Sequence, residues 1–171
     1  DEFDVEGIKS ALRNKNIKLI EIQRSKGYSN RKSITISMIR DIVKEIRSVS
    51  SDVIIMVDNC YCEFVENKTP TGVGADVMVG SLIKNLGASI APNGAYIAGK
   101  KELVELAGER LTLPGEGREV GPSLGINKAI LQGLYFAPQV VANSLKTAVL
   151  TSKVMEKLNI EVEPTSNEKR A

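Results

Sequence analysis

VIIMVDNCYCEFVENKTPTGVGADVMVGSLIKNLGASIAPNGAYIA, residues 53–98, is the stretch that decides the fold of this chain. It contains three short apolar runs, at residues 53–57, 77–79 and 95–98, and turn-forming residues bound each of them. Apolar runs of this length are typical of buried strands in a parallel sheet. We therefore predict an α/β fold with a mostly parallel sheet and helices on both faces.

Polar side chains follow two of these runs. Asp58 ends the first run, while Ser81 and Lys84 follow the second. Open α/β sheets bind ligands beyond the carboxyl ends of their strands, so we expect this carboxylate, hydroxyl and amine to face one crevice. Pyridoxal phosphate needs such a set: a lysine for its aldehyde, a carboxylate for its ring nitrogen and a hydroxyl for its phosphate.

Several segments resemble the aluminium-resistance, methionine gamma-lyase-like family, which belongs to the fold-type-I pyridoxal-phosphate enzymes alongside the cystathionine lyases. The resemblance within the central stretch lies in DNCYCEF (58–64), PTGVGAD (70–76), SLIKN (81–85) and APNGAYIAGK (91–100). It extends over nearly the whole chain through EFDVEGIK (2–9), IQRSKGYSNRKS (22–33), LTLPGEGREVGPSLG (111–125) and LQGLYFAPQVV (131–141). The resemblance implies the central part of the large domain of a fold-type-I enzyme, with pyridoxal 5'-phosphate as its cofactor.

The resemblance also implies roles for the polar residues. By this match Lys84 is the Schiff-base lysine and Asp58 is the partner of the pyridine nitrogen. Ser81 falls where related lyases place a phosphate-binding serine, although a serine in this position also commonly caps a turn.

Four nearby residues depart from the family pattern. Cys62 and Leu86 stand where a glycine and a proline are expected, and Ala88 and Ser89 stand where glycines are expected. Glycine adopts backbone conformations that other residues avoid, so these departures affect the expected geometry of the loops beside the site.

The polar loop 23–31 follows a predicted strand over residues 17–22 and is expected to overhang the same crevice. In related lyases this loop approaches the ring oxygen of the cofactor, which makes Tyr28, Arg24 and Ser25 candidate site residues. The alternative is an exposed polar loop. Tyr61 is a further cofactor-binding candidate, against a packing role beside the strand end.

Helical periodicity predicts most of the remaining elements. Ser33 is the predicted N-cap of a helix over residues 34–49. Pro138 is predicted to lie in the first turn of a helix that is separate from the helix starting at residue 127. Asn159 is predicted to close that last helix. Shorter helices are expected at residues 3–14 and 101–109.

Domain organisation follows from the comparison with complete fold-type-I enzymes, which are much longer. Residues 1–158 are expected to be part of the pyridoxal-phosphate-binding large domain. Residues 159–171 are expected to begin the linker to a C-terminal small domain.

The segment GEGREVG, residues 115–121, invites a nucleotide-binding interpretation. Its last glycine misses the dinucleotide spacing by one residue, however, and no clean strand precedes it. A mobile loop that lines the substrate channel or contacts a second subunit fits better. Arg118 and Glu119 then belong either to an interface salt bridge or to an ordinary solvated pair.

Composition limits the partners and the chemistry. The 171 residues carry 23 basic and 21 acidic side chains, and this balance gives no reason to expect a nucleic-acid partner. No apolar run approaches the roughly 18 residues of a membrane helix, and the acidic start lacks a signal peptide, so we expect a cytoplasmic protein without a membrane partner. Cys60 and Cys62 are expected to be free thiols. Because the chain has no histidine, we expect no metal site, and proton transfer must use other side chains.

The residues and the resemblance together predict a pyridoxal-phosphate-dependent carbon–sulfur lyase that acts on sulfur-containing amino acids by β- or γ-elimination. Lys84, kept deprotonated by a desolvated site, would remove the Cα proton of the substrate. A homodimer or homotetramer is implied by the resemblance. Two alternatives stay open: an aminotransferase-like enzyme with the same Asp–Lys chemistry, and a catalytically incomplete α/β fragment.

Overall fold

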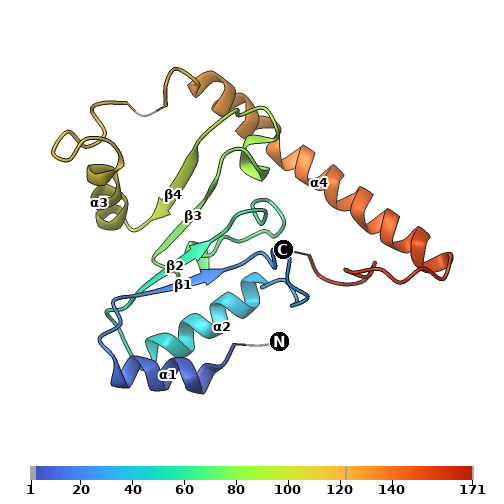
Figure 1. Ribbon diagram of the computed structural model, residues 1–171, viewed down its shortest axis with the longest axis horizontal. Coiled ribbons are helices and arrows are strands. Elements are labelled where there is room, and N and C mark those ends of the chain that lie inside the picture. The colour runs from blue at the N-terminus through green and yellow to red at the C-terminus, as the bar shows by residue number, and fades with distance from the viewer. Residues whose placement is uncertain (1–2, 122, 171) are drawn as a thin grey trace.

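The structure is a computed structural model that describes residues 3–121 and 123–170. A four-stranded sheet lies at its centre, and helices flank the sheet (Figure 1). The elements in chain order are α1 (Val5–Asn14), β1 (Leu19–Gln23), α2 (Ile36–Arg47), β2 (Ile54–Asp58), the 3₁₀ turn η1 (Thr71–Val73), β3 (Val77–Ser81), the 3₁₀ turn η2 (Asn85–Gly87), β4 (Ala95–Gly99), α3 (Lys101–Leu111) and α4 (Asn127–Lys157).

The sheet has the strand order β1-β2-β3-β4, and its first three strands are parallel. This confirms the prediction of a mostly parallel sheet. The prediction that the third apolar run is also a parallel strand is wrong, because β4 pairs with β3 in the antiparallel sense, with Ser81 opposite Ala95. Only the short turn η2 lies between these strands, so the chain doubles back without the helix that a parallel connection ordinarily uses.

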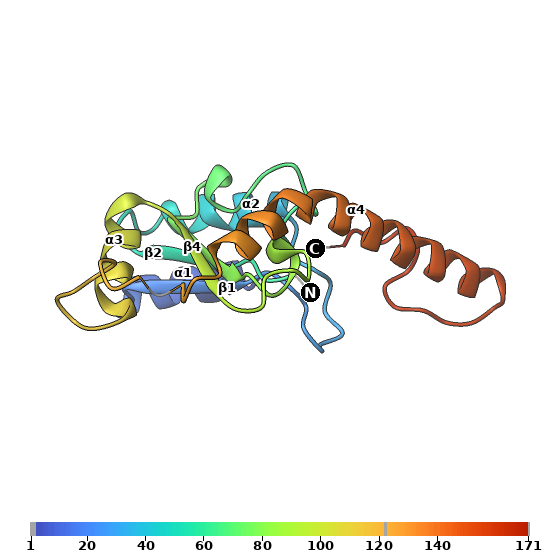
Figure 2. The ribbon, with the colours of Figure 1, turned by 90° about the horizontal axis from the view of Figure 1, so that it is seen from above.

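The hydrophobic core lies between α2 and one face of the sheet. Ile22 of β1 and Val57 of β2 are register partners on this face, and both are buried. Ile39 and Ile46, one face of the α2 helix, are completely buried against them. The next row of the sheet faces the other way, and there Val79 shares a cavity with residues of α3. Helices therefore lie on both sides of the sheet, as predicted (Figure 2).

Helix α2 begins at a different residue from the one predicted. Thr35, and not Ser33, is the N-cap, and its Oγ1 accepts a hydrogen bond from the N–H of Met38 at 3.4 Å. Both residues have a hydroxyl, so the sequence offers two candidates within one turn. Ile36 settles the choice, because its burial against the sheet fixes where the first turn begins.

Helix α4 is a single helix of 31 residues that contains Pro138, which corrects the prediction of two helices. Proline lacks an N–H and crowds the preceding turn, so a helix interior tolerates it only where other contacts compensate. Here Gly133 and Ala137 are buried, and a Cβ added at Gly133 would lie 2.4 Å from the carbonyl oxygen of Gly87. The close packing of Gly133 holds the helix against η2 just before the proline. Asn159 follows the helix with φ 60°, which confirms its predicted closing role.

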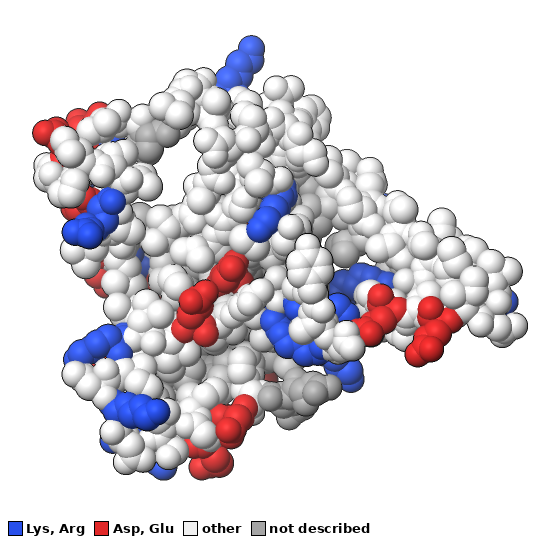
Figure 3. All heavy atoms as spheres, viewed as in Figure 1, with Lys and Arg blue, Asp and Glu red and all other residues white. Residues whose placement is uncertain are grey.

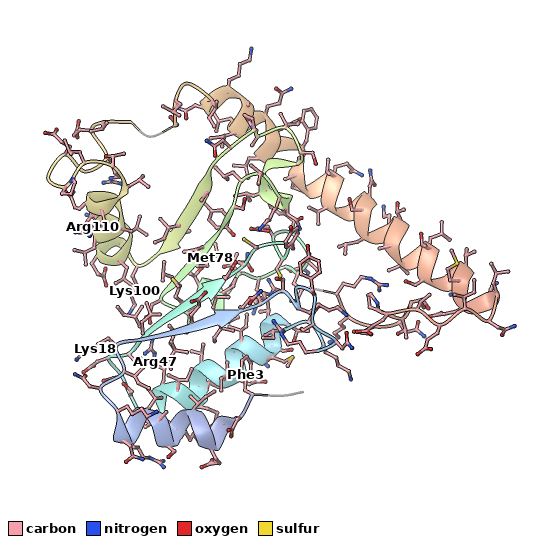
Figure 4. All side chains as sticks on the ribbon, viewed as in Figure 1. Phe3, Lys18, Arg47, Met78, Lys100 and Arg110 are labelled. Carbon is pink, nitrogen blue, oxygen red and sulfur yellow. The ribbon has the colours of Figure 1, made fainter. Side chains whose placement is uncertain are left out.

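The amino end of β3 is fixed by a buried carboxylate, far along the sheet from the site described below. Asp76 accepts a hydrogen bond from the N–H of Ile55 at 2.7 Å and pairs with Lys100 at 2.8 Å. Arg47 also pairs with it, and the labelled Arg47 and Lys100 lie at the same end of the sheet in Figure 4. Burial alone would raise the pKa of Asp76, but Lys100, the Ile55 N–H and Arg47 outweigh it and lower the pKa.

Residues 159–170 run back along α4. Ser152 Oγ donates to the carbonyl oxygen of Pro164 at 3.1 Å, and the N–H of Ser166 donates to Glu156 at 2.7 Å. Glu163 forms an ion pair with Lys26, at 2.7 Å, in the loop after β1. The tail is therefore attached to two parts of the chain, and its assignment as a linker stays a prediction.

Candidate functional site

The carboxyl ends of β2 and β3 meet at one cavity. Asp58, Cys60 and Ser81 line this cavity of about 560 Å³ together with apolar residues of β4 and α3. It opens between α3 and β4, where Figure 3 shows a hollow in the molecule. One carboxylate oxygen of Asp58 accepts the N–H of Cys60 at 2.9 Å, which orients the carboxylate at the edge of the cavity. Ser81 Oγ accepts the N–H of Ile83 at 3.3 Å, so its hydroxyl hydrogen remains available as a donor.

Lys84 lies next to the same group of residues. Its Nζ lies 4.6 Å from the centre of the Tyr61 ring, within the range of a cation–π contact. Partial burial lowers the pKa of Lys84, but Cys60, Tyr61 and Asp58 beside it outweigh that effect and raise the pKa. These neighbours favour the protonated form of the amine, which is a proton donor. The expectation of a deprotonated Lys84 refers to the amine in a site that holds cofactor and substrate, and it stays a prediction.

Cys60 lies at the centre of this group, and sequence reasoning missed it as a site residue. Burial raises the pKa of its thiol, and hydrogen bonding to Asp58 raises it further, while Lys84 opposes both. These interactions place the thiol within reach of both Asp58 and Lys84. Its position two residues after a strand-ending aspartate was the signal for this role, since an Asx turn brings such a residue back toward the carboxylate.

The loop after β1 contributes differently from what we predicted. Tyr28 is fully exposed at the loop surface, away from the cavity lined by Asp58, so its cofactor role stays a prediction. Ser25 is half-buried, and its carbonyl oxygen accepts a hydrogen bond from Arg31. Arg24 is only 1% exposed, and its guanidinium donates to the carbonyl oxygen of Ile34, to Asn59 and to Glu66. Arg24 therefore connects the loop after β1 to the segment that follows β2, and it does not line the cavity.

Two of the four departures from the family pattern, Ala88 and Ser89, occupy special backbone positions. Ala88 has φ 49° and Ser89 has φ 60°, the left-handed region that favours glycine. The chain keeps the glycine-like path of this loop although the glycines are absent. Cys62, the third departure, is 2% exposed, and burial raises the pKa of its thiol to about 12. Cys60 and Cys62 are not bonded to each other.

The loop after α3 also reaches the cavity. Arg118 lines it, and the Arg118 Cγ would lie 3.0 Å from a Cβ added at Gly108 of α3. This location agrees with a loop that lines a channel. A contact of Arg118 or Glu119 with a second subunit stays a prediction.

In residues 3–121 and 123–170, no group of three or more His, Cys, Asp or Glu side chains is arranged to hold a metal ion. Across the same ranges, no helix combines the length and the apolar character needed to cross a membrane.

Comparison with known proteins identifies the class to which this fold and site belong. The family model described as Methionine gamma-lyase matches residues 1–171, and the chain belongs to this family of carbon–sulfur lyases. An uncharacterised protein of Bacillus subtilis, YnbB, is 44% identical over 169 residues, which are 99% of this chain and 40% of that protein.

Two solved structures make the relationship more specific. A candidate cystathionine beta-lyase involved in aluminum resistance from Clostridium acetobutylicum is 49% identical, with a TM-score of 0.93 over 98% of this chain and 40% of that chain. A carbon-sulfur lyase involved in aluminum resistance from Clostridium novyi is 43% identical, with a TM-score of 0.92 over 99% of this chain and 40% of that chain. These findings confirm the predicted family and fold. The chain spans about 40% of the length of these relatives.

Proposed function

We propose that the protein is a pyridoxal-phosphate-dependent carbon–sulfur lyase that acts on sulfur-containing amino acids by β- or γ-elimination. The observation that carries this proposal is the meeting of Asp58, Ser81 and Lys84 around Cys60 at the carboxyl ends of two parallel strands. The family and the names of the related structures support the lyase class.

The residues present fit pyridoxal phosphate. Asp58 offers a carboxylate at the edge of the cavity, which suits the protonated ring nitrogen. Ser81 offers a hydroxyl hydrogen to the phosphate, and Lys84 offers a primary amine to the aldehyde. Tyr61 presents a flat ring beside that amine. When bound, the cofactor supplies an electron sink for negative charge at the substrate Cα.

The chain's own groups then hold and move protons. Asp58, as an anion, holds the proton on the ring nitrogen. Lys84 Nζ is the group placed to exchange a proton with the substrate Cα. Its neighbours favour the protonated amine, so Lys84 must first lose a proton before it can accept one from Cα. In its protonated form it can give a proton to the departing sulfur. The Tyr61 ring covers one side of Nζ and limits the access of water.

Assembly and location are part of the proposal. We infer a homodimer or homotetramer, because α4 exposes large apolar side chains that an interface would cover. These are Leu131, Leu134, Tyr135, Phe136, Val140, Leu150 and Val154. A cytoplasmic location is supported by the two unbonded cysteines, since free thiols persist in reducing compartments.

The test is an absorption spectrum of the full-length protein with added pyridoxal phosphate, before and after borohydride. We expect a visible band that borohydride removes by fixing the cofactor on Lys84. Lys84→Ala should lack the band, while Lys128→Ala, a change at the start of α4, should keep it. Ammonia and a keto acid formed without an amino acceptor would separate a lyase from an aminotransferase. Absence of any Lys84-dependent band would overturn the proposal.

A further inference from the structure

A chain of buried hydrogen bonds lies directly behind the turn that carries Asp58. Asn59 Oδ1 accepts from Arg24 Nη1 at 2.9 Å, and Asn59 Nδ2 donates to the Tyr96 hydroxyl at 3.3 Å. The Tyr96 hydroxyl donates in turn to Glu63 Oε1 at 2.8 Å. These four side chains come from the end of β1, from the turn after β2 and from β4. The chain of bonds therefore ties three strands together at their site end.

The turn that these bonds support has an unfavourable backbone. Tyr61 has φ 67° and Phe64 has φ 62°, and neither residue is glycine. Such conformations persist only where the surrounding structure imposes them. Arg24 supplies part of that constraint, because its backbone N–H donates to the carbonyl oxygen of Asp58 at 3.0 Å and its guanidinium donates to that of Cys62 at 3.3 Å.

Glu63 is the one acidic side chain among these four, and it is almost completely buried. It is 6% exposed, and its Oε2 is buried with no hydrogen-bond partner among the residues that the structure describes. An ionised oxygen buried in this way is costly, so the carboxyl group is best accommodated with a proton. Burial raises its pKa accordingly.

Gly80 makes room for this pair beside Ser81. A Cβ at Gly80 would lie 2.6 Å from Glu63 Oε1 and 2.5 Å from Cε1 of Tyr96. The absence of a side chain lets both residues press against β3. The network thereby contacts the strand that carries Ser81 as well as the turn that carries Asp58.

We infer that Tyr96 and Glu63 are positioning residues, which act through Asn59 to hold the strained turn that sets Asp58 and Tyr61 toward the cofactor. This inference rests on the proposed function. Neither residue needs to contact the cofactor. Tyr96 bonds to Asn59, Glu63 bonds to Tyr96, and Asn59 directly follows Asp58 in the chain. The buried Oε2 without a described partner favours the neutral form of Glu63 in this arrangement.

The first test is Tyr96→Phe in the full-length protein, which removes only the hydroxyl that joins Asn59 to Glu63. We expect the dissociation constant for pyridoxal phosphate, measured by absorption titration, to rise at least tenfold. We also expect Cys60, which lies in the same turn, to react at least tenfold faster with iodoacetamide. Ser10→Ala, which removes an exposed hydroxyl from α1, is the control, and both values should stay unchanged.

A second pair of variants tests the charge of Glu63. Glu63→Gln keeps a neutral hydrogen-bonding group of nearly the same shape, so cofactor affinity and Cys60 reactivity should stay close to wild type. Glu63→Ala should change both as Tyr96→Phe does. Ile39→Val, a change on the buried face of α2, controls for a general loss of stability. It should lower the melting temperature without changing cofactor affinity.

The outcomes separate the inference from the proposed function. Unchanged cofactor affinity in Tyr96→Phe overturns the inference, whatever Cys60 does, while the Lys84-dependent band of the wild type still supports the proposed function. The inference is also overturned if Ile39→Val weakens cofactor binding as much as Tyr96→Phe does. If the wild type shows no Lys84-dependent band, the proposed function fails and the inference falls with it.

Discussion

The amine of Lys84 lies 4.6 Å from the centre of the Tyr61 ring. Tyr61 reaches this position because its backbone adopts φ 67° in the turn that follows β2. The strained turn thus places an aromatic face beside Lys84, the one lysine between β3 and β4. Asp58 is the last residue of β2, and Tyr61 follows it by three residues. The same short segment therefore determines the positions of both side chains.

Replacement of Tyr61 tests this contact directly. Tyr61→Phe keeps the aromatic face and should leave the binding of pyridoxal phosphate close to wild type. Tyr61→Ala removes the face and should weaken binding by about 0.5–1 kcal/mol, the value of an exposed cation–π contact. Titration of each variant with the cofactor measures the difference. Equal affinity in both variants would show that the ring has only a packing role.

The carboxylate of Asp76 should make stability depend on pH. Its pKa is lowered in the folded chain, so its contribution is fully present above the ordinary aspartate pKa of about 3.9 and is lost as the pH falls through the folded-state value. Asp76→Asn should therefore lower the free energy of unfolding by about 1–3 kcal/mol at neutral pH, and by less in acid. Urea unfolding at several pH values measures this.

The control for that experiment is Asp52→Asn. Asp52 is exposed, and its carboxylate accepts a hydrogen bond only from its neighbour Ser51 among the contacts described. Its replacement should leave the free energy of unfolding unchanged within about 0.5 kcal/mol. An equal loss in both variants at every pH would contradict the role assigned to Asp76.

The two cysteines should differ in reactivity. Cys60 lines the cavity, whereas Cys62 is 2% exposed with its pKa raised to about 12. Because the thiolate is the reactive form, iodoacetamide should modify Cys60 slowly and Cys62 only when the protein unfolds. Peptide mapping by mass spectrometry distinguishes the two sites. Bound pyridoxal phosphate should slow the modification of Cys60 further, and comparable rates at the two cysteines would be evidence against the described burial.

Restoring a glycine in the loop after Lys84 should stabilise the protein. Ser89 has φ 60° and is exposed, so Ser89→Gly removes the left-handed strain without losing a packed side chain. We expect a gain of up to about 1 kcal/mol in the free energy of unfolding. Lys44→Gly, on the exposed face in the interior of α2, is the contrasting change and should cost about 0.5–1 kcal/mol. A loss of stability in Ser89→Gly would contradict the assigned backbone conformation.

Local pattern predicted the strands and most helices because their burial depends on short-range periodicity. Ile36, Ile39, Val43 and Ile46 repeat at the helical spacing and pack on the sheet as expected. The direction of β4 was not predictable in this way, since an apolar strand looks the same in either sense. It depends on the connection, where η2 replaces a crossover helix.

Other features depended on contacts between distant residues. The continuity of α4 through Pro138 depends on Gly133 packing against Gly87, and a helix rule applied to α4 alone cannot include that contact. The positions of Asp58 and Ser81 at neighbouring strand ends followed from the parallel sheet. Arg24 was predicted in the correct loop, but its burial and its bonds to Asn59 arise only when the loop closes over the turn after β2.

The contact between Gly133 and Gly87 joins α4 to the segment that begins at Lys84. A helix of 31 residues is roughly 45 Å long, and it rests on this segment near its amino end while the remainder extends past the sheet (Figure 2). With so little space between the two backbones, the helix cannot tilt without displacing η2. A contact that moves the carboxyl end of α4 would therefore also move η2, because the two pack together at Gly87, three residues after Lys84.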